Sequence, residues 1–413
     1  MADYEFLTVE NIPDYIRSTP TLAEVIDPDD LVLCDEIGDG NLNLVFLAKD
    51  TSGRGLCLKQ SLPYVRMTGE GWPMTPDRAR HEAETLAAHG ALVPDLVPAM
   101  YHYNPERYII AMEDLSDHRV WRGALNEGLS HTGAAEAVGR YVGAVAFGTS
   151  PLGMEREALA EAIARSVNPQ LCEITEDLVF TEPLVDAGRN SCLPANEPDA
   201  REFSEDAAMM RAMGHAKWLF MTKAEALLHG DLHTGSVMVR AEGEPDADGV
   251  VACDSIKCFD SEFAYYGPLA FDIGAPWANY VAAAARAVAL GEDERARWCL
   301  SLVSATWNAF EAEFRRRWPQ RRDPRVWTDA TLEDLLLTWR SEAWLFAAAK
   351  MSRRIVGAAK NKDVETLPEN LREGAARGIL RLSRQLVRQA GVDSSPDAFE
   401  RLAHDVLLEN RTR

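Results

Sequence analysis

The chain has 413 residues, of which 46% are hydrophobic and 26% charged, an ordinary globular composition with room for one bilobal enzyme or a few smaller domains. Its formal net charge of −22 argues against nucleic acid or an anionic membrane as a partner, because phosphate-rich surfaces favour Lys and Arg. From the acidic first residues and the short apolar stretches we expect neither a secretory signal nor a membrane span, and the seven cysteines lack zinc-site spacing, so we expect a protein of the reducing cytoplasm.

The first third of the chain is predicted to be rich in β-strands. Residues 31–37, 42–50 and 56–60 have strand composition, and a glycine-rich turn joins the last two. The next element is predicted to be a helix with Thr75 as its N-cap, and Gly90 follows as a stop signal.

A further apolar strand is predicted at residues 108–112, and the chain beyond it is predominantly helical. Three strands, a helix, another strand and then helices is the order of a bilobal kinase. We therefore expect an α+β, protein-kinase-like fold with an N-terminal lobe at 1–112, a hinge at 113–116 and a C-terminal lobe at 117–413.

A glycine-containing turn lies between the first two predicted strands. Its residues tolerate positive φ and expose backbone N–H groups, which could cover the β- and γ-phosphates of ATP. The turn lacks the full G-x-G-x-x-G pattern, and alone it is typical of an ordinary hairpin. The residues proposed to bind the nucleotide here are Gly38, Asp39, Gly40, Asn41 and Asn43.

Lys59 ends a strand of apolar neighbours. It could be a surface lysine that extends its ammonium to water, but its place after a glycine turn and before a helix favours a lysine that pairs the ATP phosphates. Glu82 is the expected partner, because Glu84 lies about 200° further round the helix. The backbone of Glu113 and Leu115, at the lobe junction, is expected to bind adenine.

The segment His229-Gly-Asp-Leu-His-Thr-Gly-Ser236 has the pattern of a phosphotransferase catalytic loop. Asp231 could orient a substrate hydroxyl and accept its proton, although an aspartate in a turn is often only a cap. A predicted hairpin then leads to Asp260 and Glu262, whose carboxylates could hold Mg²⁺. This arrangement would bring a base and metal ligands into one cleft.

Three further side chains of this region are expected to support the loop. His229 and His233 are interpreted as hydrogen-bonding scaffolds rather than proton carriers. Asp272 is interpreted as a structural carboxylate that anchors the backbone of the catalytic loop.

Several segments between Gly38 and about Arg354 resemble the bacterial and plant 5-methylthioribose kinases, within the wider choline and aminoglycoside kinase-like group. The segments are Gly38-Asp-Gly-Asn-Leu-Asn43, Leu58-Lys-Gln-Ser-Leu-Pro-Tyr-Val-Arg66, Gly69-Glu-Gly-Trp-Pro-Met-Thr75, the catalytic loop, Asp260-Ser-Glu-Phe-Ala-Tyr-Tyr-Gly-Pro268 and Phe271-Asp-Ile-Gly-Ala275. The resemblance implies transfer of the ATP γ-phosphate to the anomeric hydroxyl of 5-methylthioribose, in methionine salvage. It also implies a homodimer.

Two positions depart from the general kinase pattern. Ser236 stands where most such loops carry a metal-binding Asn, and Glu262 is expected to compensate. Position 233 is His where protein kinases use Lys, so the γ-phosphate needs another cation. Arg353 and Arg354 are the candidates, because guanidinium groups suit phosphate, although adjacent arginines on a helix often form only a solvated face.

The resemblance places two more residues at the acceptor. Trp72 belongs to a loop that lies over the active site in the resembling family, where an aromatic lid would exclude water. Asn41 of the glycine-containing turn is the second candidate. Otherwise Trp72 could simply fasten its loop to the core.

Two other functions remain open from the sequence. A kinase of the same fold could act on another small alcohol, such as an aminoglycoside, choline or a homoserine-like acceptor, but a cationic acceptor would not suit Arg353 and Arg354. A nucleotide-binding pseudokinase would be expected to lack Lys59, Asp231 or Asp260, and all three are present.

Overall fold

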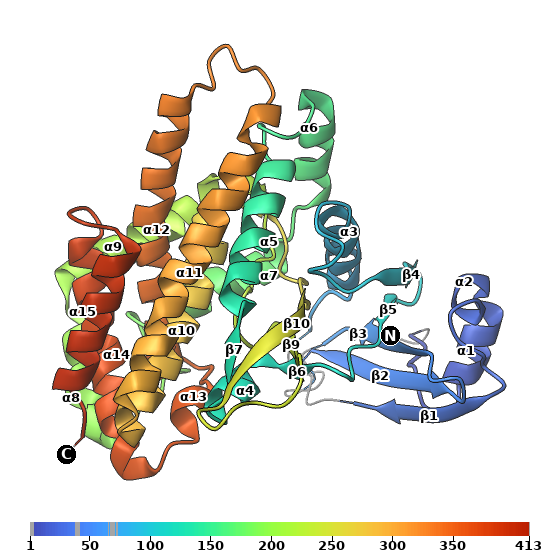
Figure 1. Ribbon diagram of the computed structural model, residues 1–413, viewed down its shortest axis with the longest axis horizontal. Coiled ribbons are helices and arrows are strands. Elements are labelled where there is room, and N and C mark those ends of the chain that lie inside the picture. The colour runs from blue at the N-terminus through green and yellow to red at the C-terminus, as the bar shows by residue number, and fades with distance from the viewer. Residues whose placement is uncertain (1–3, 38–41, 65, 67–70, 72, 413) are drawn as a thin grey trace.

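The computed structural model describes residues 4–37, 42–64, 66, 71 and 73–412. An antiparallel sheet near the N-terminus lies at one end of the molecule, and long helices make up the other end (Figure 1). The expected α+β architecture, with a β-rich first part and a mainly helical remainder, is confirmed. The exact lobe and hinge boundaries stay a prediction.

The N-terminal sheet has five strands in the order β1-β2-β3-β5-β4, and each neighbouring pair is antiparallel. Its strands are β1 Leu31–Glu36, β2 Asn43–Asp50, β3 Gly55–Ser61, β4 Met100–Asn104 and β5 Ile109–Glu113. The strand β4 was not predicted, because its Met-Tyr-His-Tyr-Asn sequence is half-buried throughout and has no alternating pattern.

The two faces of this sheet are covered by different helices. Helices α1 (Ile12–Ser18) and α2 (Pro20–Ala23), which were not predicted, pack with Leu56, Leu58 and Ile109 on one face. Helix α3 (Arg78–Gly90) packs with Ile110 and Met112 on the other. Since side chains alternate along a strand, Lys59 projects to the α3 face.

Helix α3 begins later than predicted. The expected cap, Thr75, accepts a hydrogen bond from the Asp77 backbone N–H at 3.2 Å, and its carbonyl accepts one from Arg78 at 2.9 Å. These bonds form a turn before the helix, which starts at Arg78 with Gly90 as its last residue.

The remainder of the chain is built mainly from helices. They are α4 Trp121–Asn126, α5 Ala134–Gly148, α6 Arg156–Arg165, α7 Pro169–Thr175, a π-helix Glu176–Thr181, a 3-10 helix Pro194–Asn196, α8 Glu197–Ser204, α9 Ala207–Thr222, α10 Ala270–Leu290, α11 Asp293–Arg317, a 3-10 helix Trp318–Gln320, α12 Asp329–Val356, α13 Lys362–Glu365, α14 Glu369–Gln389 and α15 Pro396–Glu409.

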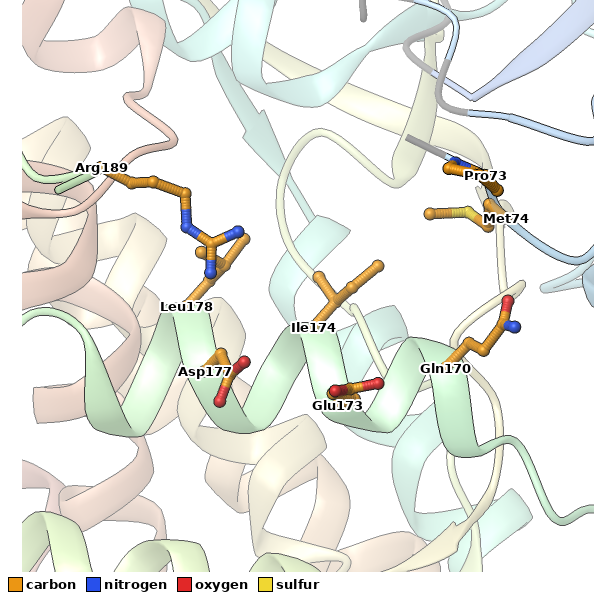
Figure 2. A pocket seen from close by; sticks show the side chains of 8 residues that line it. All are labelled: Pro73, Met74, Gln170, Glu173, Ile174, Asp177, Leu178 and Arg189. Carbon is orange, nitrogen blue, oxygen red and sulfur yellow. The ribbon is translucent and has the colours of Figure 1, made fainter. Parts of the chain in front are cut away.

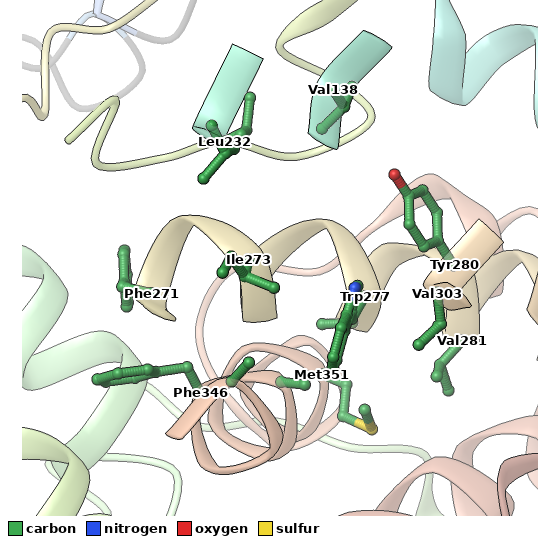
Figure 3. Close-up of a cluster of buried hydrophobic side chains, with 14 of the residues drawn as sticks. Val138, Leu232, Phe271, Ile273, Trp277, Tyr280, Val281, Val303, Phe346 and Met351 are labelled. Carbon is green, nitrogen blue, oxygen red and sulfur yellow. The ribbon is translucent and has the colours of Figure 1, made fainter. Parts of the chain in front are cut away.

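Helix α10 lies at the centre of the large apolar core. Figure 3 shows its side chains Phe271, Ile273 and Trp277 between Leu232 of the catalytic loop on one side and Phe346 of α12 on the other. All of these side chains are buried. The loop that carries Asp231 is therefore fixed to the most extensively packed helix of the protein.

A small hairpin separates the catalytic loop from Asp260, as predicted. Its strands are β9 Val237–Ala241 and β10 Val250–Cys258, which pair antiparallel. The short strands β6 Arg119–Val120, β7 Ser130–Thr132, β8 Ala226–Leu227 and β11 Tyr266–Gly267 complete the sheets of this part. The hairpin returns the chain to the catalytic loop, where the Phe259 N–H donates to the Ser236 carbonyl at 3.0 Å.

All seven cysteines are free thiols. None of the helices in the described part of the chain has the length and apolar character needed to cross a membrane.

Candidate active site

Asp272 anchors the backbone at the start of the catalytic loop. Its carboxylate, in the first turn of α10, accepts hydrogen bonds from the backbone N–H of His229 at 2.6 Å and of Gly230 at 3.2 Å. Burial raises the pKa of Asp272, and the bonds from the loop oppose that shift. The predicted anchoring role of this residue is confirmed.

His229 connects the loop to the turn that carries Asp260. Its Nε2 lies 2.8 Å from the Phe259 carbonyl oxygen, which can only accept, so Nε2 carries the proton. Gly230 has φ of +82°, and a Cβ there would lie 2.1 Å from the Phe263 carbonyl oxygen. Only glycine allows the two segments to approach this closely.

Both carboxylate oxygens of Asp231 have a donor nearby. Lys350 Nζ lies 2.6 Å from Oδ1, and His233 Nε2 lies 3.4 Å from Oδ2. Although burial opposes it, the positive charges of Lys350 and Arg353, together with the hydrogen bond from His233, hold the pKa of Asp231 well below its usual range. At neutral pH Asp231 is therefore an anion surrounded by donors.

His233 is a neutral donor to Asp231. Its Nδ1 accepts from the Gly235 N–H at 3.0 Å, which leaves the proton on the nitrogen that faces Asp231. Burial is the main cause that lowers the pKa of His233 to about 4, and nearby Arg122 adds to it. This arrangement matches the scaffold role predicted for the residue.

Ser236 is engaged within the loop itself. Its hydroxyl oxygen accepts from the His233 N–H at 2.8 Å, and it lies 2.9 Å from the carbonyl oxygens of Asp231 and His233. The side chain is buried. This geometry favours a residue that shapes the loop over one that binds a metal.

On the opposite side of the site, Lys59 joins two carboxylates. Its Nζ lies 2.7 Å from Glu82 and also forms an ion pair with Asp260. Burial lowers the pKa of Lys59, but Asp260 and Glu82 outweigh it and raise the pKa overall. The expected pairing with Glu82 is present, while Glu84 pairs with Arg80 and Arg165 instead.

Glu262 is held by two side chains from the N-terminal part. Asn43 Nδ2 donates to its Oε2 at 2.9 Å, and Arg78 Nε donates to the same oxygen at 3.2 Å. Arg78 is fully buried, and its guanidinium also donates to the carbonyl oxygens of Leu62, Thr75 and Leu42. Arg78 was not singled out from the sequence, because a single arginine at a helix start has no distinguishing pattern.

The carboxylates of this side fit a divalent cation. One oxygen each of Glu82, Asp260 and Glu262 lies within 4.8 Å of the other two. Burial raises the pKa of Glu82 to about 7, and it raises that of Glu262, with Asp260 adding to both shifts. A bound cation would relieve this repulsion, and oxygen ligands suit Mg²⁺. Asp260 has the most exposed side chain of the three, whereas Glu82 and Glu262 are both buried, so the arrangement is compatible with Asp260 and Glu262 as ligands without excluding Glu82.

The backbone of Asp260 has a left-handed conformation, with φ of +68°. This conformation is uncommon for a residue other than glycine and is often found at functional sites. It turns the carboxylate from the end of the hairpin toward Lys59.

Arg353 and Arg354 do not lie on a solvent-exposed face of their helix. Both lie in the last turn of α12, and Arg353 is buried with an Nε that has no hydrogen-bond partner among the described residues. Burial lowers the pKa of both arginines, and repulsion from Arg353 lowers that of Arg354 further. The negative charge of Asp231 opposes both shifts. The charges of both arginines thus interact with that of Asp231.

A fourth cation reaches the loop from α4. Arg122 donates to Asn279 Oδ1 at 2.7 Å and its Nε lies 3.4 Å from buried Asp363. Its backbone N–H also donates to the Thr234 carbonyl at 2.9 Å. Neither Lys350 nor Arg122 was predicted, although Lys350 lies one helical turn before Arg353 and Arg354, a spacing that could have indicated a shared face.

The predicted hinge residues lie where strand β5 ends. The Glu113 N–H donates to the Ala99 carbonyl at 2.8 Å, and its carboxylate pairs with Lys257 at 3.1 Å. The Leu115 carbonyl accepts from the His118 N–H at 2.9 Å. Gly38, Asp39, Gly40, Asn41 and Trp72 lie outside the described residues.

A cavity of about 330 Å³ lies beside the segment that precedes α3. Figure 2 shows Ile174 of α7 on the side of the cavity near Pro73 and Met74, and Leu178 of the π-helix further along, next to Arg189. Gln170, which also lines it, accepts from the Thr75 N–H at 2.7 Å. The catalytic carboxylates do not line this cavity, so the two are separate features of the described structure.

The phosphotransferase enzyme family matches residues 34–311 of this chain. The methylthioribose kinase of Yersinia pseudotuberculosis serotype O:1b (strain IP 31758) is 38% identical over 399 residues, which cover 94% of this chain and 93% of that protein. The methylthioribose kinase of Pectobacterium atrosepticum is 37% identical, over 97% of this chain and 98% of that protein. The chain belongs to the methylthioribose kinase family.

Among solved structures, a choline/ethanolamine kinase family protein from Mesorhizobium loti aligns with 98% of this chain and all of its own, at 14% identity and a TM-score of 0.42. The relatives of the methylthioribose kinase family match over nearly their whole length. The resemblance predicted from the motifs is thus confirmed.

Proposed function

We propose that this protein is an ATP-dependent kinase that phosphorylates the anomeric hydroxyl of 5-methylthioribose and forms 5-methylthioribose 1-phosphate in methionine salvage. The similarity to methylthioribose kinases over nearly the whole chain supports the acceptor. The observation that carries the proposal is Asp231, a half-buried anion that faces cations on one side of the site, while Lys59 and a cluster of three carboxylates lie on the other side.

In the proposed reaction Asp231 orients the sugar hydroxyl for attack. The hydroxyl oxygen forms a bond to the γ-phosphorus while the bond between that phosphorus and the bridging oxygen of ADP breaks. The hydroxyl proton passes to Asp231. Because the pKa of Asp231 is held low, its main contribution is orientation, and it takes the proton late in the transfer.

Lys59 would pair the α- and β-phosphates of ATP, with Glu82 holding its ammonium in place. The backbone amides of residues 38–43 would cover the β- and γ-phosphates. The backbone of Glu113 and Leu115 would bind adenine. Arg353 and Arg354 would contact the acceptor and the transferred group, with Asn41 and Trp72 also at the acceptor.

Asp260 and Glu262 would hold Mg²⁺, whose positive charge would neutralise the phosphates. Lys59 lies against Asp260 in the present arrangement, and Arg78 with Asn43 fixes the Glu262 oxygen. His229, His233 and Ser236 would keep the loop in shape without touching the substrate.

An ADP-release assay separates the proposal from the alternatives. The acceptors are methylthioribose, choline, an aminoglycoside, homoserine and buffer alone. We expect turnover with methylthioribose only, because a cationic acceptor would meet Lys350, Arg353 and Arg354. Turnover of choline or the aminoglycoside alone would indicate a different small-alcohol kinase, and nucleotide binding without any turnover would indicate a pseudokinase.

Two variants test the assigned roles. Asp231→Ala should nearly abolish sugar phosphorylation and leave ATP binding close to wild type, measured by calorimetry. Asp260→Asn should weaken Mg-ATP binding, with Asp254→Asn as the matched control, since Asp254 pairs only with surface Arg240 in the described structure. Full turnover by the first variant, or an unchanged Mg²⁺ dependence of the second, would refute the corresponding role.

We also propose that the protein is a cytoplasmic homodimer, as the resemblance implies. Multi-angle light scattering of the purified protein tests the dimer, and fractionation of cells tests the location.

A further inference from the structure

Lys350 places an ammonium in contact with the proposed catalytic carboxylate; burial lowers the pKa of Lys350 to about 8, and the charge of Asp231 opposes that shift. Its Nζ lies 2.6 Å from Asp231 Oδ1, and the residue is 4% exposed. The residue comes from α12, 119 positions further along the chain than Asp231. Its place therefore depends on the packing of α12 against α10.

The ammonium is held from two sides. Its nitrogen lies 4.9 Å from the centre of the Phe271 ring, on α10, and Asp231 lies at hydrogen-bonding distance. A lysine ammonium has three N–H donors. Within the described structure, Lys350 uses its hydrogen bonds for Asp231 alone, which leaves donor capacity for another acceptor.

The other groups near Asp231 bring no positive charge into direct contact with its carboxylate. His233 is neutral above a pKa of about 4 and faces the second carboxylate oxygen. Arg353 and Arg354 act on Asp231 through their charge, without a direct hydrogen bond in the described part of the chain. Lys350 is thus the cation in direct contact with the proposed base.

We infer that Lys350 is a catalytic residue whose ammonium bridges Asp231 and the transferring phosphoryl group. It would do the work of the loop lysine that position 233 lacks, from a helix instead of the loop. The inference rests on the proposed kinase function. As the hydroxyl oxygen bonds to phosphorus and ADP departs, negative charge on the phosphoryl oxygens would meet the free N–H donors of Lys350.

The first test compares three lysine variants. Lys350→Met, which keeps the length of the side chain, should lower kcat by roughly 10²–10³-fold and change ATP affinity little, because the lost contact forms in the transition state. Lys350→Arg should recover part of the loss. Lys362→Met, at an exposed lysine of α13, is the matched control. A Lys350→Met enzyme with near wild-type kcat would overturn the inference.

The second test separates contact with phosphate from simple neutralisation of Asp231. In an Asp231→Asn background the carboxylate charge is gone, so a mere counterion would no longer matter. Calorimetry with 5-methylthioribose 1-phosphate should show about tenfold weaker binding for Asp231→Asn/Lys350→Met than for Asp231→Asn. Equal affinities would overturn the inference. The double variant also lacks the uncompensated buried charge that could unfold Lys350→Met.

Failure of the proposed acceptor would be visible separately. Wild-type protein that turns over another acceptor refutes the methylthioribose assignment, and the same variants then test Lys350 with that acceptor and its phosphate ester. A loss of kcat in Lys350→Met with that acceptor would support the role of Lys350, and an unchanged kcat would refute it.

Discussion

A buried side chain of α3, Arg78, connects the N-terminal part of the protein to Glu262. Its guanidinium bonds to Glu262, to Asn43 Oδ1 and to three backbone carbonyl oxygens. A lysine has one nitrogen and cannot reach this spread of acceptors. The orientation of Glu262 therefore depends on the planar shape of the arginine as well as on its charge.

Arg78→Lys should raise the Mg²⁺ concentration needed for half-maximal activity and lower the free energy of unfolding by roughly 2–4 kcal/mol, because buried acceptors lose their donors. A Mg²⁺ titration at saturating ATP and a urea unfolding curve measure the two effects. Arg140→Lys is the control, since Arg140 is exposed and pairs with Asp95. An unchanged Mg²⁺ requirement would show that Arg78 does not position Glu262.

Between elements, α3 is tied to the catalytic region through His89. Its Nε2 donates to the Leu227 carbonyl at 3.1 Å, and its Nδ1 accepts from the Tyr141 hydroxyl at 2.8 Å. Burial lowers the pKa of His89 to about 3. The helix that carries Glu82 is thereby fixed to strand β8, directly before the catalytic loop.

His89→Gln should destabilise the protein at pH 7.5, and the difference from wild type should shrink as the pH falls. Below about pH 6.5 His89 binds a proton in the unfolded chain but not in the folded one, so wild type loses up to about 1.4 kcal/mol per pH unit from this residue. The stability of the variant does not fall with pH through this residue, because glutamine does not titrate. Urea unfolding at pH 7.5, 6 and 5 measures the difference, and a constant or growing difference would contradict the buried neutral histidine.

Helices α5 and α11 pack closely at Gly139, where a Cβ would lie 2.2 Å from the Thr306 carbonyl oxygen. Gly139→Ala should therefore destabilise the protein by about 2 kcal/mol through overpacking. Gly214→Ala in α9 is the matched control, because its added methyl meets nothing within 4 Å and should stabilise the helix by about 0.5–1 kcal/mol. Thermal unfolding of both variants measures the two effects. Equal melting temperatures of Gly139→Ala and Gly214→Ala would refute the close contact at Gly139.

At the scale of the whole molecule, the net charge of −22 coexists with a strongly basic segment at Arg315–Arg325. Most of its arginines pair with carboxylates: Arg315 with Glu311 and Glu333, Arg316 and Arg317 with Glu313, Arg322 with Glu155, and Arg325 with Asp323. Most of the positive charge of the segment is therefore balanced within the fold, while the acidic excess is spread over the rest of the chain.

This excess predicts that salt stabilises the protein. Raising NaCl from about 20 mM to about 300 mM should raise the melting temperature, because screening reduces repulsion among the acidic groups more than it weakens exposed ion pairs. Differential scanning calorimetry across the series measures the trend. A melting temperature that falls with salt would mean that the surface ion pairs dominate.

Much of this architecture could be predicted from local sequence. Strand composition and turn residues located β1, β2, β3, β5 and the β9–β10 hairpin within a residue or two. The catalytic loop was recognisable because its residues are consecutive, and the Lys59–Glu82 pair because strand and helix periodicity give each side chain a direction. Strand β4 was missed because its residues do not alternate, and helices α1 and α2 were missed because they are only seven and four residues long, although Ile12, Tyr15 and Ile16 of α1 have helical spacing.

The arrangement of charges around Asp231 and Glu262 was decided by tertiary packing. Arg353 and Arg354 could equally have faced solvent, Lys350 had only its helical spacing to these arginines as a signal, and Arg78 had none. In the structure Lys350 pairs with Asp231 and Arg78 with Glu262, while the charges of Arg353 and Arg354 interact with that of Asp231. Local pattern sets which elements form, since it depends on neighbours a few residues apart. Which cation meets which carboxylate depends on how α12, α10 and α3 pack across more than a hundred residues, and burial then makes each pairing energetically necessary.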